Sequence, residues 1–407
     1  MAEQHEKALV PQIRFTGFTD PWEQRKLGEV ARRVTRKNEN GDSDLPLTIS
    51  AQYGLVDQRT FFNSQVASKD MSGYFLLHRG EFAYNKSTST DSPWGAIKRL
   101  EKYDMGCVST LYICFELLSG DPDFLVTYYE TDRWYKSVQL IAAEGARNHG
   151  LLNIAPDDFF ETQICIPKRI DEQRRIGAFF DRLDSLITLH QRKYDKLCVL
   201  KKSMLDKMFP KGGSLYPEIR FAGFTDPWEQ RKLGELFEES DERASDREIL
   251  SVSVANGIYP ASESDRETNP GASLANYKVV HSGDVVYNSM RMWQGAVDAS
   301  RYDGIVSPAY VVAKPNSEVY ARFFARLLRQ PMLLKQYQQV SQGNSKDTQV
   351  LKFDDFASIE ISMPASENEQ RQIGAFFDRL DSLITLHQRK LELLRNIKKS
   401  MLDKMFV

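Results

Sequence analysis

The chain has 407 residues, and 54 lysines and arginines against 56 aspartates and glutamates give it a net charge of −2. Hydrophobic residues make up 41% and charged residues 27%, which excludes a disordered protein and favours two or three folded domains. Four scattered cysteines exclude a disulfide framework, and we find no secretory signal or apolar run of membrane-helix length. We therefore expect a cytoplasmic protein that makes no membrane contact.

Two segments of the chain occur twice. The leading segment, residues 11–29, reads PQIRFTGFTDPWEQRKLGE and returns almost unchanged at residues 217–235. A longer segment, residues 172–209, returns at residues 369–406, and both copies end in KKSMLDKMF. The order is leading segment, variable block, long repeat, then the same again, so the chain is a tandem of two similar halves.

The two variable blocks share a pattern of short apolar segments. GEFAYN from Gly80 parallels GDVVYN from Gly283, and VSTLYICF from Val108 parallels VSPAYVVA from Val306. EFAY, DVVY, LYICF and AYVV are rich in β-branched and aromatic residues, which predicts strands. The residues after Asp123 (FLVTYYETDRWYKSVQL) and after Glu318 (VYARFFARLL, ending near Pro331) predict helices. Each block therefore predicts a mixed α/β domain.

The long repeats have apolar residues at alternating spacings of three and four, as in a coiled coil. We predict one long helix for each, with seam residues Ile176, Phe180, Leu183 and Ile187 in the first copy and Ile373, Phe377, Leu380 and Ile384 in the second. Polar seam residues His190, Lys201, His387 and Lys398 would fix the register or face a third partner. Plain core packing in a helical bundle is the alternative interpretation.

These patterns together predict an α+β fold, in which two mixed α/β domains are separated by an antiparallel coiled coil of two long helices. The tandem halves would be related by a pseudo-two-fold axis. We expect the first domain at residues 1–170, the first long helix at 171–209, the second domain at 210–365 and the second long helix at 366–407.

The sequence contains none of the common motifs for nucleotide binding, metalloprotease or esterase chemistry. The acidic pairs at 157–158 and 354–355 are more typical of helix caps than of a metal site. We therefore expect no catalytic residues, no metal and no cofactor in this chain.

The layout of the chain, with its two EQR-IGAFFDRLDSLITLHQRK helices and PWEQRKLGE segments, resembles the specificity subunit of a Type I restriction-modification system. That resemblance covers the whole chain. It implies that both variable domains are target recognition domains, each reading one half of a bipartite, asymmetric sequence in double-stranded DNA. It further implies that the helices set the gap and bind two modification subunits, which methylate adenine with S-adenosylmethionine. Restriction subunits, which use ATP and Mg²⁺, complete the assembly.

The loops that differ most between the blocks carry the polar side chains that could read DNA. We predict the DNA contacts at Asn85, Lys86, Arg147, Asn148, Asn288, Arg291, Trp293, Gln294, Asn344 and Lys346. A solvated turn is the simpler interpretation of any one of them, and Trp293 could equally lie in the core. Two other functions remain open: a two-headed adaptor that binds proteins, and an enzyme that acts alone.

Overall fold

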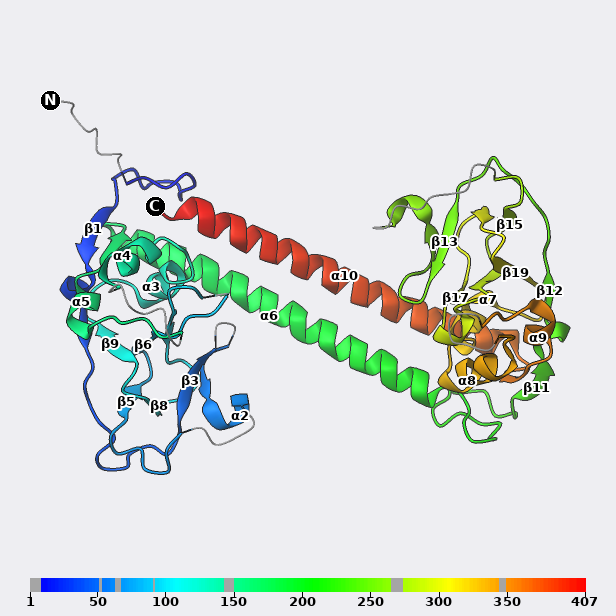
Figure 1. The fold of residues 1–407 in the computed structure, drawn as a ribbon, viewed down its shortest axis with the longest axis horizontal. Helices are drawn as coiled ribbons and strands as arrows, with labels where there is room; N and C mark the ends of the chain where they lie inside the picture. The colour runs from blue at the N-terminus through cyan, green and yellow to red at the C-terminus, as the bar shows by residue number, and fades with distance from the viewer. Residues whose placement is uncertain are drawn as a thin grey trace. The chain divides into compact units, whose positions relative to one another are not determined.

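The computed structural model describes residues 9–50, 53–62, 67–90, 92–142, 150–264, 274–343 and 349–407. The chain divides into an N-terminal unit, Met1–His190 with Lys390–Val407, and a C-terminal unit, Gln191–Arg389 (Figure 1). Each unit contains one mixed α/β domain together with one segment from each long helix. Within the described ranges, no helix has both the length and the apolar character of a membrane span.

Both domains are built from short strands and short helices. The first comprises β1 (Glu23–Lys26), α1 (Leu27–Val30), β2 (Ala31–Arg33), β3 (Leu47–Ser50), β4 (Gly54–Asp57), α2 (Gln58–Phe62), β5 (Phe75–His78), β6 (Phe82–Asn85), β7 (Ala96–Arg99), β8 (Met105–Val108), β9 (Ile113–Leu117), α3 (Pro122–Tyr128), α4 (Tyr135–Ile141), α5 (Pro156–Phe160) and β10 (Gln163–Ile166). The second comprises β11 (Glu229–Lys232), η1 (Leu233–Glu235), β12 (Phe237–Glu239), β13 (Leu250–Ser253), β14 (Gly257–Pro260), η2 (Ala261–Glu263), β15 (Lys278–Val280), β16 (Val285–Asn288), η3 (Met292–Gln294), β17 (Val297–Ala299), β18 (Gly304–Val306), β19 (Tyr310–Pro315), α7 (Ala321–Leu327), α8 (Pro331–Val340), α9 (Phe353–Ala357) and β20 (Glu360–Met363).

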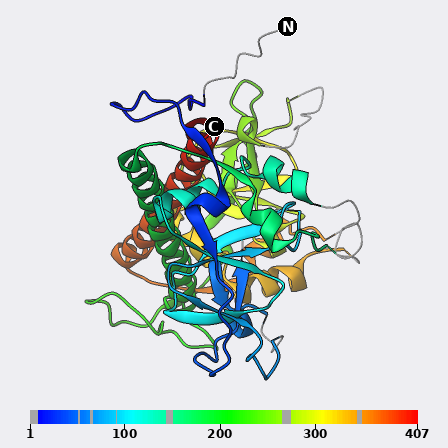
Figure 2. The ribbon, with the colours of Figure 1, turned by 90° about the vertical axis from the view of Figure 1, so that its left-hand side faces the viewer.

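The strands of the two domains pair in the same antiparallel order. The central sheet runs β2-β9-β6-β7 in the first domain, seen in the unit that faces the viewer in Figure 2, and β12-β19-β16-β17 in the second. The registers also agree, because Ala83 of β6 opposes Lys98 just as Val286 of β16 opposes Asp298. EFAY, DVVY, LYICF and AYVV thus lie mainly in the central strands β6, β16, β9 and β19, as predicted.

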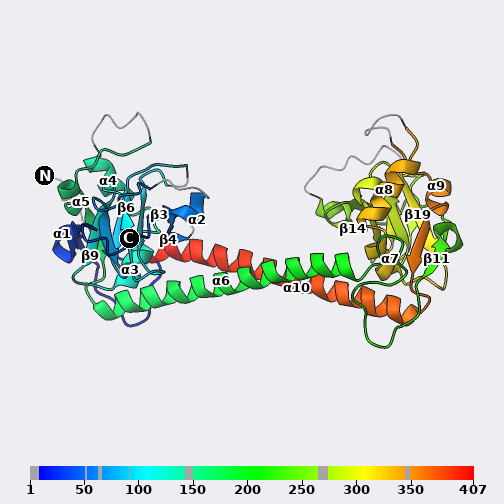
Figure 3. The same cartoon turned by 90° about the horizontal axis from the view of Figure 1, so that it is seen from below.

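Aromatic side chains fill the core between the central sheet and its helices. Tyr84 of β6 stacks on Phe159 of α5 with ring centroids 4.8 Å apart, and Tyr287 of β16 lies 5.1 Å from Phe356 of α9. Figure 3 shows α7, α8 and α9 of the C-terminal unit gathered around β19. The duplicated "DDF" of the sequence therefore supplies one core phenylalanine to each domain, and the acidic pairs lie in the first turns of α5 and α9.

The two predicted long helices are present as α6 (Ile170–Lys207) and α10 (Glu367–Met405). Acidic residues occupy the first turn of each helix and a lysine the last, which complements the helix dipole. In the N-terminal unit Asp184 of α6 pairs with Lys398 of α10 at 2.6 Å, and in the C-terminal unit Lys201 pairs with Asp381 at 2.5 Å. The start of each helix therefore lies beside the end of the other, which is the antiparallel arrangement expected.

The single helix predicted after Asp123 is wrong, because the segment forms α3 and α4 with a break between them. Thr131 explains the break: its hydroxyl donates to the carbonyl oxygen of Tyr128 at 2.6 Å and so caps the end of α3. In the second domain Pro331 does not only end α7 but begins α8, at the helix position where a missing N–H costs nothing.

Candidate nucleic-acid interface

An asparagine ends the central strand of each domain and forms the same turn. The side-chain oxygen of Asn85, at the end of β6, accepts the N–H of Ser87 at 3.0 Å. Asn288, at the end of β16, accepts the N–H of Met290 at 3.1 Å. Each bond uses the acceptor of the amide group and not its two donors, so the side chain can still donate to a ligand.

The segment after each of these strands lies against the base of the second predicted polar loop. In the first domain the N–H of Thr88 donates to the oxygen of Gly150 at 2.6 Å. In the second domain the N–H of Leu351 donates to the oxygen of Ser289 at 2.9 Å. Arg147, Asn148, Asn344 and Lys346, predicted in those loops, lie outside the described residues. In both domains the structure thus brings together the ends of two loops that the sequence singled out separately.

Lys86 is a half-buried cation in the first of these segments. Its Nζ donates to the carbonyl oxygen of Ile154 at 3.3 Å, and burial lowers the pKa of its amine. A lysine that folding has partly stripped of water gains more from a nearby phosphate than a fully hydrated one does. The side chain is therefore suited to an anion, although it is less accessible than the sequence suggested.

Arg291, Trp293 and Gln294 lie on or next to the short helix η3 of the second domain. Arg291 is exposed, and its guanidinium donates to the side-chain oxygen of Gln294 at 3.2 Å. Trp293 is half-buried against the core of the C-terminal unit, and its indole donates to the oxygen of Met290 at 3.2 Å. Of the three, Arg291 offers the accessible cation, whereas Trp293 serves chiefly in packing.

The predicted seam residues divide into two groups. Six are buried, and two that stand farther along the helices, Ile187 and Ile384, are half-buried. The buried ones are Ile176, Phe180 and Leu183 on α6 and Ile373, Phe377 and Leu380 on α10. Five of these six belong to the large core clusters of the two units and not to a separate helix–helix seam. The beginning of each helix is therefore part of a domain core.

A buried polar cluster joins each leading segment to the start of a long helix. Glu172, 1% exposed, accepts two hydrogen bonds from Arg14, at 2.6 and 2.7 Å, and one from the indole of Trp22 at 3.3 Å. Glu369 receives Arg220 in the same way, at 2.7 and 2.8 Å. The hydrogen bond with the glutamate raises the pKa of each arginine. Three hydrogen-bond donors, two from the arginine and one from a tryptophan indole, thus replace the water that each carboxylate loses on burial.

The glutamine that follows each of these glutamates fastens the same helix to its domain. Gln173 accepts the N–H of Asp121, at the start of α3, at 2.8 Å. Gln370 accepts the N–H of Tyr320, at the start of α7, at 2.9 Å. Apolar periodicity does not predict these clusters, although the Arg-Phe, Pro-Trp and Glu-Gln-Arg stretches that supply their side chains all lie in the segments that occur twice in the sequence.

Among the residues described, the structure places no group of three or more His, Cys, Asp or Glu side chains where they could hold a metal ion. The strand-end turns offer hydrogen-bond donors and a guanidinium, groups that bind base edges and phosphates.

Residues 225–396 match the model of a family described as the Type I restriction modification DNA specificity domain. The fold is similar to a Type I restriction-modification system S subunit from M. genitalium, with 15% identity, a TM-score of 0.58, and coverage of 98% of this chain and 99% of that one. The HsdS subunit from Thermoanaerobacter tengcongensis is 18% identical over 95% of this chain and 96% of that one, with a TM-score of 0.45.

The C-terminal domain with its helix is therefore a domain of the Type I DNA specificity class. The likeness to the M. genitalium subunit shows that the fold extends over both halves of the chain. The chain as a whole is therefore similar in fold to a Type I restriction-modification specificity subunit, while the family match itself covers residues 225–396.

Proposed function

We propose that each domain reads one half of a bipartite, asymmetric target in double-stranded DNA. The first reader is residues 1–170 and the second is residues 210–365. The observation that supports this best is a shared frame with different tips: the same asparagine turn ends β6 and β16 but is followed by different side chains. Two domains that share one fold but differ in the side chains of their polar turns are suited to bind two different DNA sequences.

The side chains at these turns suit base edges and phosphates. The exposed guanidinium of Arg291 can donate two bonds to a guanine, and Asn85, Asn288 and Gln294 can pair with an adenine. Lys86 would contact a phosphate, and Arg147, Asn148, Asn344 and Lys346 complete the proposed surfaces. Trp293 supports the turn from beneath.

The two long helices, residues 171–209 and 366–407, would set the gap between the half-sites and dock two modification subunits. A continuous helix gives a fixed spacing, and one turn of DNA, roughly 34 Å, returns the same groove to the same face. The helices also expose apolar side chains that a docked subunit would cover; they are Leu186, Leu189, Val199, Leu200, Leu386, Leu393 and Ile397. The partners would supply adenine methylation with S-adenosylmethionine, and restriction subunits would supply ATP- and Mg²⁺-dependent cleavage, while this chain remains non-catalytic.

Replacing Arg291 with alanine tests the proposal. The variant, expressed with its modification subunit, should methylate additional sites that differ from the wild-type target at one base of one half-site. Loss of a bidentate contact costs about 1–3 kcal/mol of discrimination. Sequencing that maps methylated adenines across a genome gives the readout.

Lys314→Ala is the matched control, because Lys314 lies on β19 away from Tyr310, the residue that opposes Asn288 at the tip. Its methylation pattern should match that of the wild type. A pattern that Arg291→Ala leaves unchanged, or methylation lost equally at every site, would count against reading by this turn.

A further inference from the structure

The polar residues of the helix seam form one ion pair that occurs twice. Lys398 of α10 contacts Asp184 of α6 in the N-terminal unit at 2.6 Å, and Lys201 of α6 contacts Asp381 of α10 in the C-terminal unit at 2.5 Å. These four residues occupy equivalent positions in the two repeats. Each unit therefore contains one copy of the same lysine–aspartate pair, and each pair has no net charge.

In the N-terminal unit the domain contributes a carboxylate to the contact with this pair. Glu130, two residues beyond α3, contacts the amine of Lys398 at 2.8 Å. Lys98 on β7 lies 3.6 Å from the same carboxylate. Both Glu130 and Lys98 are half-buried, so solvent screens these contacts less than it screens pairs at the surface. The first domain therefore contacts the lysine of the cross-helix pair.

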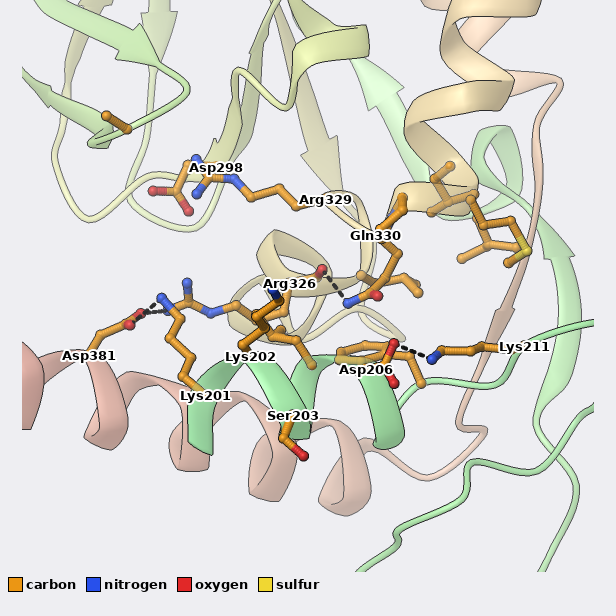
Figure 4. Close-up of a pocket in the computed structure, with 18 of the residues that line it drawn as sticks. Lys201, Lys202, Ser203, Asp206, Lys211, Asp298, Arg326, Arg329, Gln330 and Asp381 are labelled. Carbon is orange, nitrogen blue, oxygen red and sulfur yellow. Dashed lines mark hydrogen bonds and ion pairs between the residues drawn. The ribbon is translucent and has the colours of Figure 1, made fainter. Parts of the chain in front are cut away.

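In the C-terminal unit the domain contributes a cation to the contact with the helices. Arg326 of α7 contacts Asp381 at 2.7 Å and Asp378, one helical turn before it, at 3.0 Å. Figure 4 shows Arg326 and Lys201 converging on Asp381 at the edge of a cavity of about 1580 Å³. Arg301 adds a second contact to Asp378 at 3.2 Å. The second domain therefore contacts the aspartate of the cross-helix pair.

Two matching positions of the two domains carry opposite charges. Lys98 and Asp298 occupy the same register position on β7 and β17. Glu130 stands nine residues after Asp121, as Arg329 stands nine residues after Tyr320, and Asp121 and Tyr320 make the same backbone bond to the repeated glutamine. A lysine and a glutamate in the first domain thus correspond to an aspartate and to Arg329 in the second, while Arg326, which contacts Asp381, corresponds to Thr127.

A lone charge on the helices could hold a domain of one sign only, because a like charge at 3 Å would repel and a desolvated charge without a partner is costly. A lysine–aspartate pair has no net charge and offers both signs within reach of one spot. An incoming carboxylate can approach the amine, and an incoming guanidinium can approach the carboxylate. Identical repeats can therefore hold domains of opposite local charge.

We propose that the cross-helix lysine–aspartate pair is a two-sided docking element, which binds the first domain through its lysine and the second through its aspartate. Glu130 and Arg326 are the positioning residues that set each domain on the helices. The effect on DNA reading rests on the proposed function, whereas the docking itself does not.

Double-mutant cycles in the full chain without DNA test the docking, with hydrogen exchange of the α3 and α7 amides as the readout. Glu130→Gln with Lys398→Gln should be coupled in α3, and Arg326→Gln with Asp381→Asn should be coupled in α7. In each cycle the double variant should exchange up to about tenfold more slowly than the product of the single effects predicts, because residues in contact are not additive.

The crossed pairs provide the matched controls. Glu130→Gln with Asp184→Asn, and Arg326→Gln with Lys201→Gln, should show multiplied effects or coupling of the opposite sign. Asp181→Asn tests the same repeat position as Asp378→Asn, but Asp181 is exposed, so only Asp378→Asn should speed exchange in its domain. Direct pairs that behave like the crossed pairs would overturn the proposal.

DNA binding distinguishes failure of the docking from failure of the reading. In complex with modification subunits, Arg326→Gln should weaken binding several-fold through the half-site of the second domain and leave the other half-site unchanged. Coupled exchange without any effect on DNA would keep the docking element and contradict the role of the domain in reading.

Discussion

Glu172 and Glu369 show how one residue type fixes the beginning of each long helix. A carboxylate that is almost fully buried stays charged at little cost only if donors replace its lost water. Arg14 and Trp22 supply those donors to Glu172, and the leading segment is therefore placed by its own side chains.

Replacing Glu172 with glutamine should lower the stability of the N-terminal unit by about 3 kcal/mol, because the arginine of a partly buried pair is left uncompensated. Urea denaturation measures the change in the free energy of unfolding, and hydrogen exchange of the α3 amides shows that the N-terminal unit is the part affected. Glu161→Gln is the control, since Glu161 is 61% exposed in its pair with Lys26 and an exposed pair contributes about 0–1 kcal/mol. Equal losses in the two variants would contradict the role of the buried cluster.

At this scale the sequence singled out Asn85 and Asn288 as DNA contacts, which stays a prediction, but it indicated neither the turns that they form nor the Arg14–Glu172 pair. The turn residues lie next to a recognisable strand, so local pattern places them. The two members of the ion pair are 158 residues apart, and no local pattern in one copy indicates that they meet. Only the recurrence of both segments could have suggested it.

At the scale of elements, the end of each long helix completes a domain core. Phe406 lies 5.9 Å from Trp22 and 5.6 Å from Phe124 between ring centroids, and Phe209 packs in the same way on Trp228 and Phe323 in the other unit. Gly177 allows α6 to approach closely, because a Cβ there would lie 2.7 Å from the backbone nitrogen of Phe124. A helix-weakening glycine is thus retained for packing.

Phe406→Ala should destabilise the N-terminal unit by about 3–5 kcal/mol, the usual cost of removing a buried aromatic ring. Amide exchange should rise in α3 and stay unchanged in α7, and Phe209→Ala should show the reverse. Leu393→Ala, at a side chain 59% exposed on the same helix, should change neither. Faster exchange in α7 after Phe406→Ala would contradict this assignment of the cores.

Heptad spacing predicted both long helices, because their period persists over many turns. It did not show that five of the six buried seam residues lie in the cores of the units. The identity of an apolar residue does not indicate which surface will bury it. The break after α3 was missed for a similar reason: Thr131 ends that helix through one side-chain hydrogen bond, which periodicity cannot detect.

At the scale of the whole molecule, the net charge of −2 bears on DNA binding. Affinity for DNA falls with salt in proportion to the number of phosphates that a protein neutralises. Many of the arginines and lysines of this chain are already engaged in ion pairs with its own acids, including Arg14, Arg99, Arg220, Arg326 and Lys398.

The chain alone should therefore bind its target weakly and with a small salt dependence, while the complex with modification subunits should bind tightly with a steep one. Each additional phosphate contact adds about −0.9 to the slope of log K against log salt. Gel-shift titrations at several salt concentrations measure both slopes. Equal affinities and slopes with and without the partners would show that this chain supplies the phosphate contacts itself.

The order in which the cores can be completed follows from where Phe406 lies. During synthesis the first domain leaves the ribosome early, but Phe406 can pack on Trp22 and Phe124 only after the end of α10 has emerged. The C-terminal unit has no such wait, because Phe209 precedes its domain along the chain. The domain translated first is therefore expected to be the one whose core is completed last.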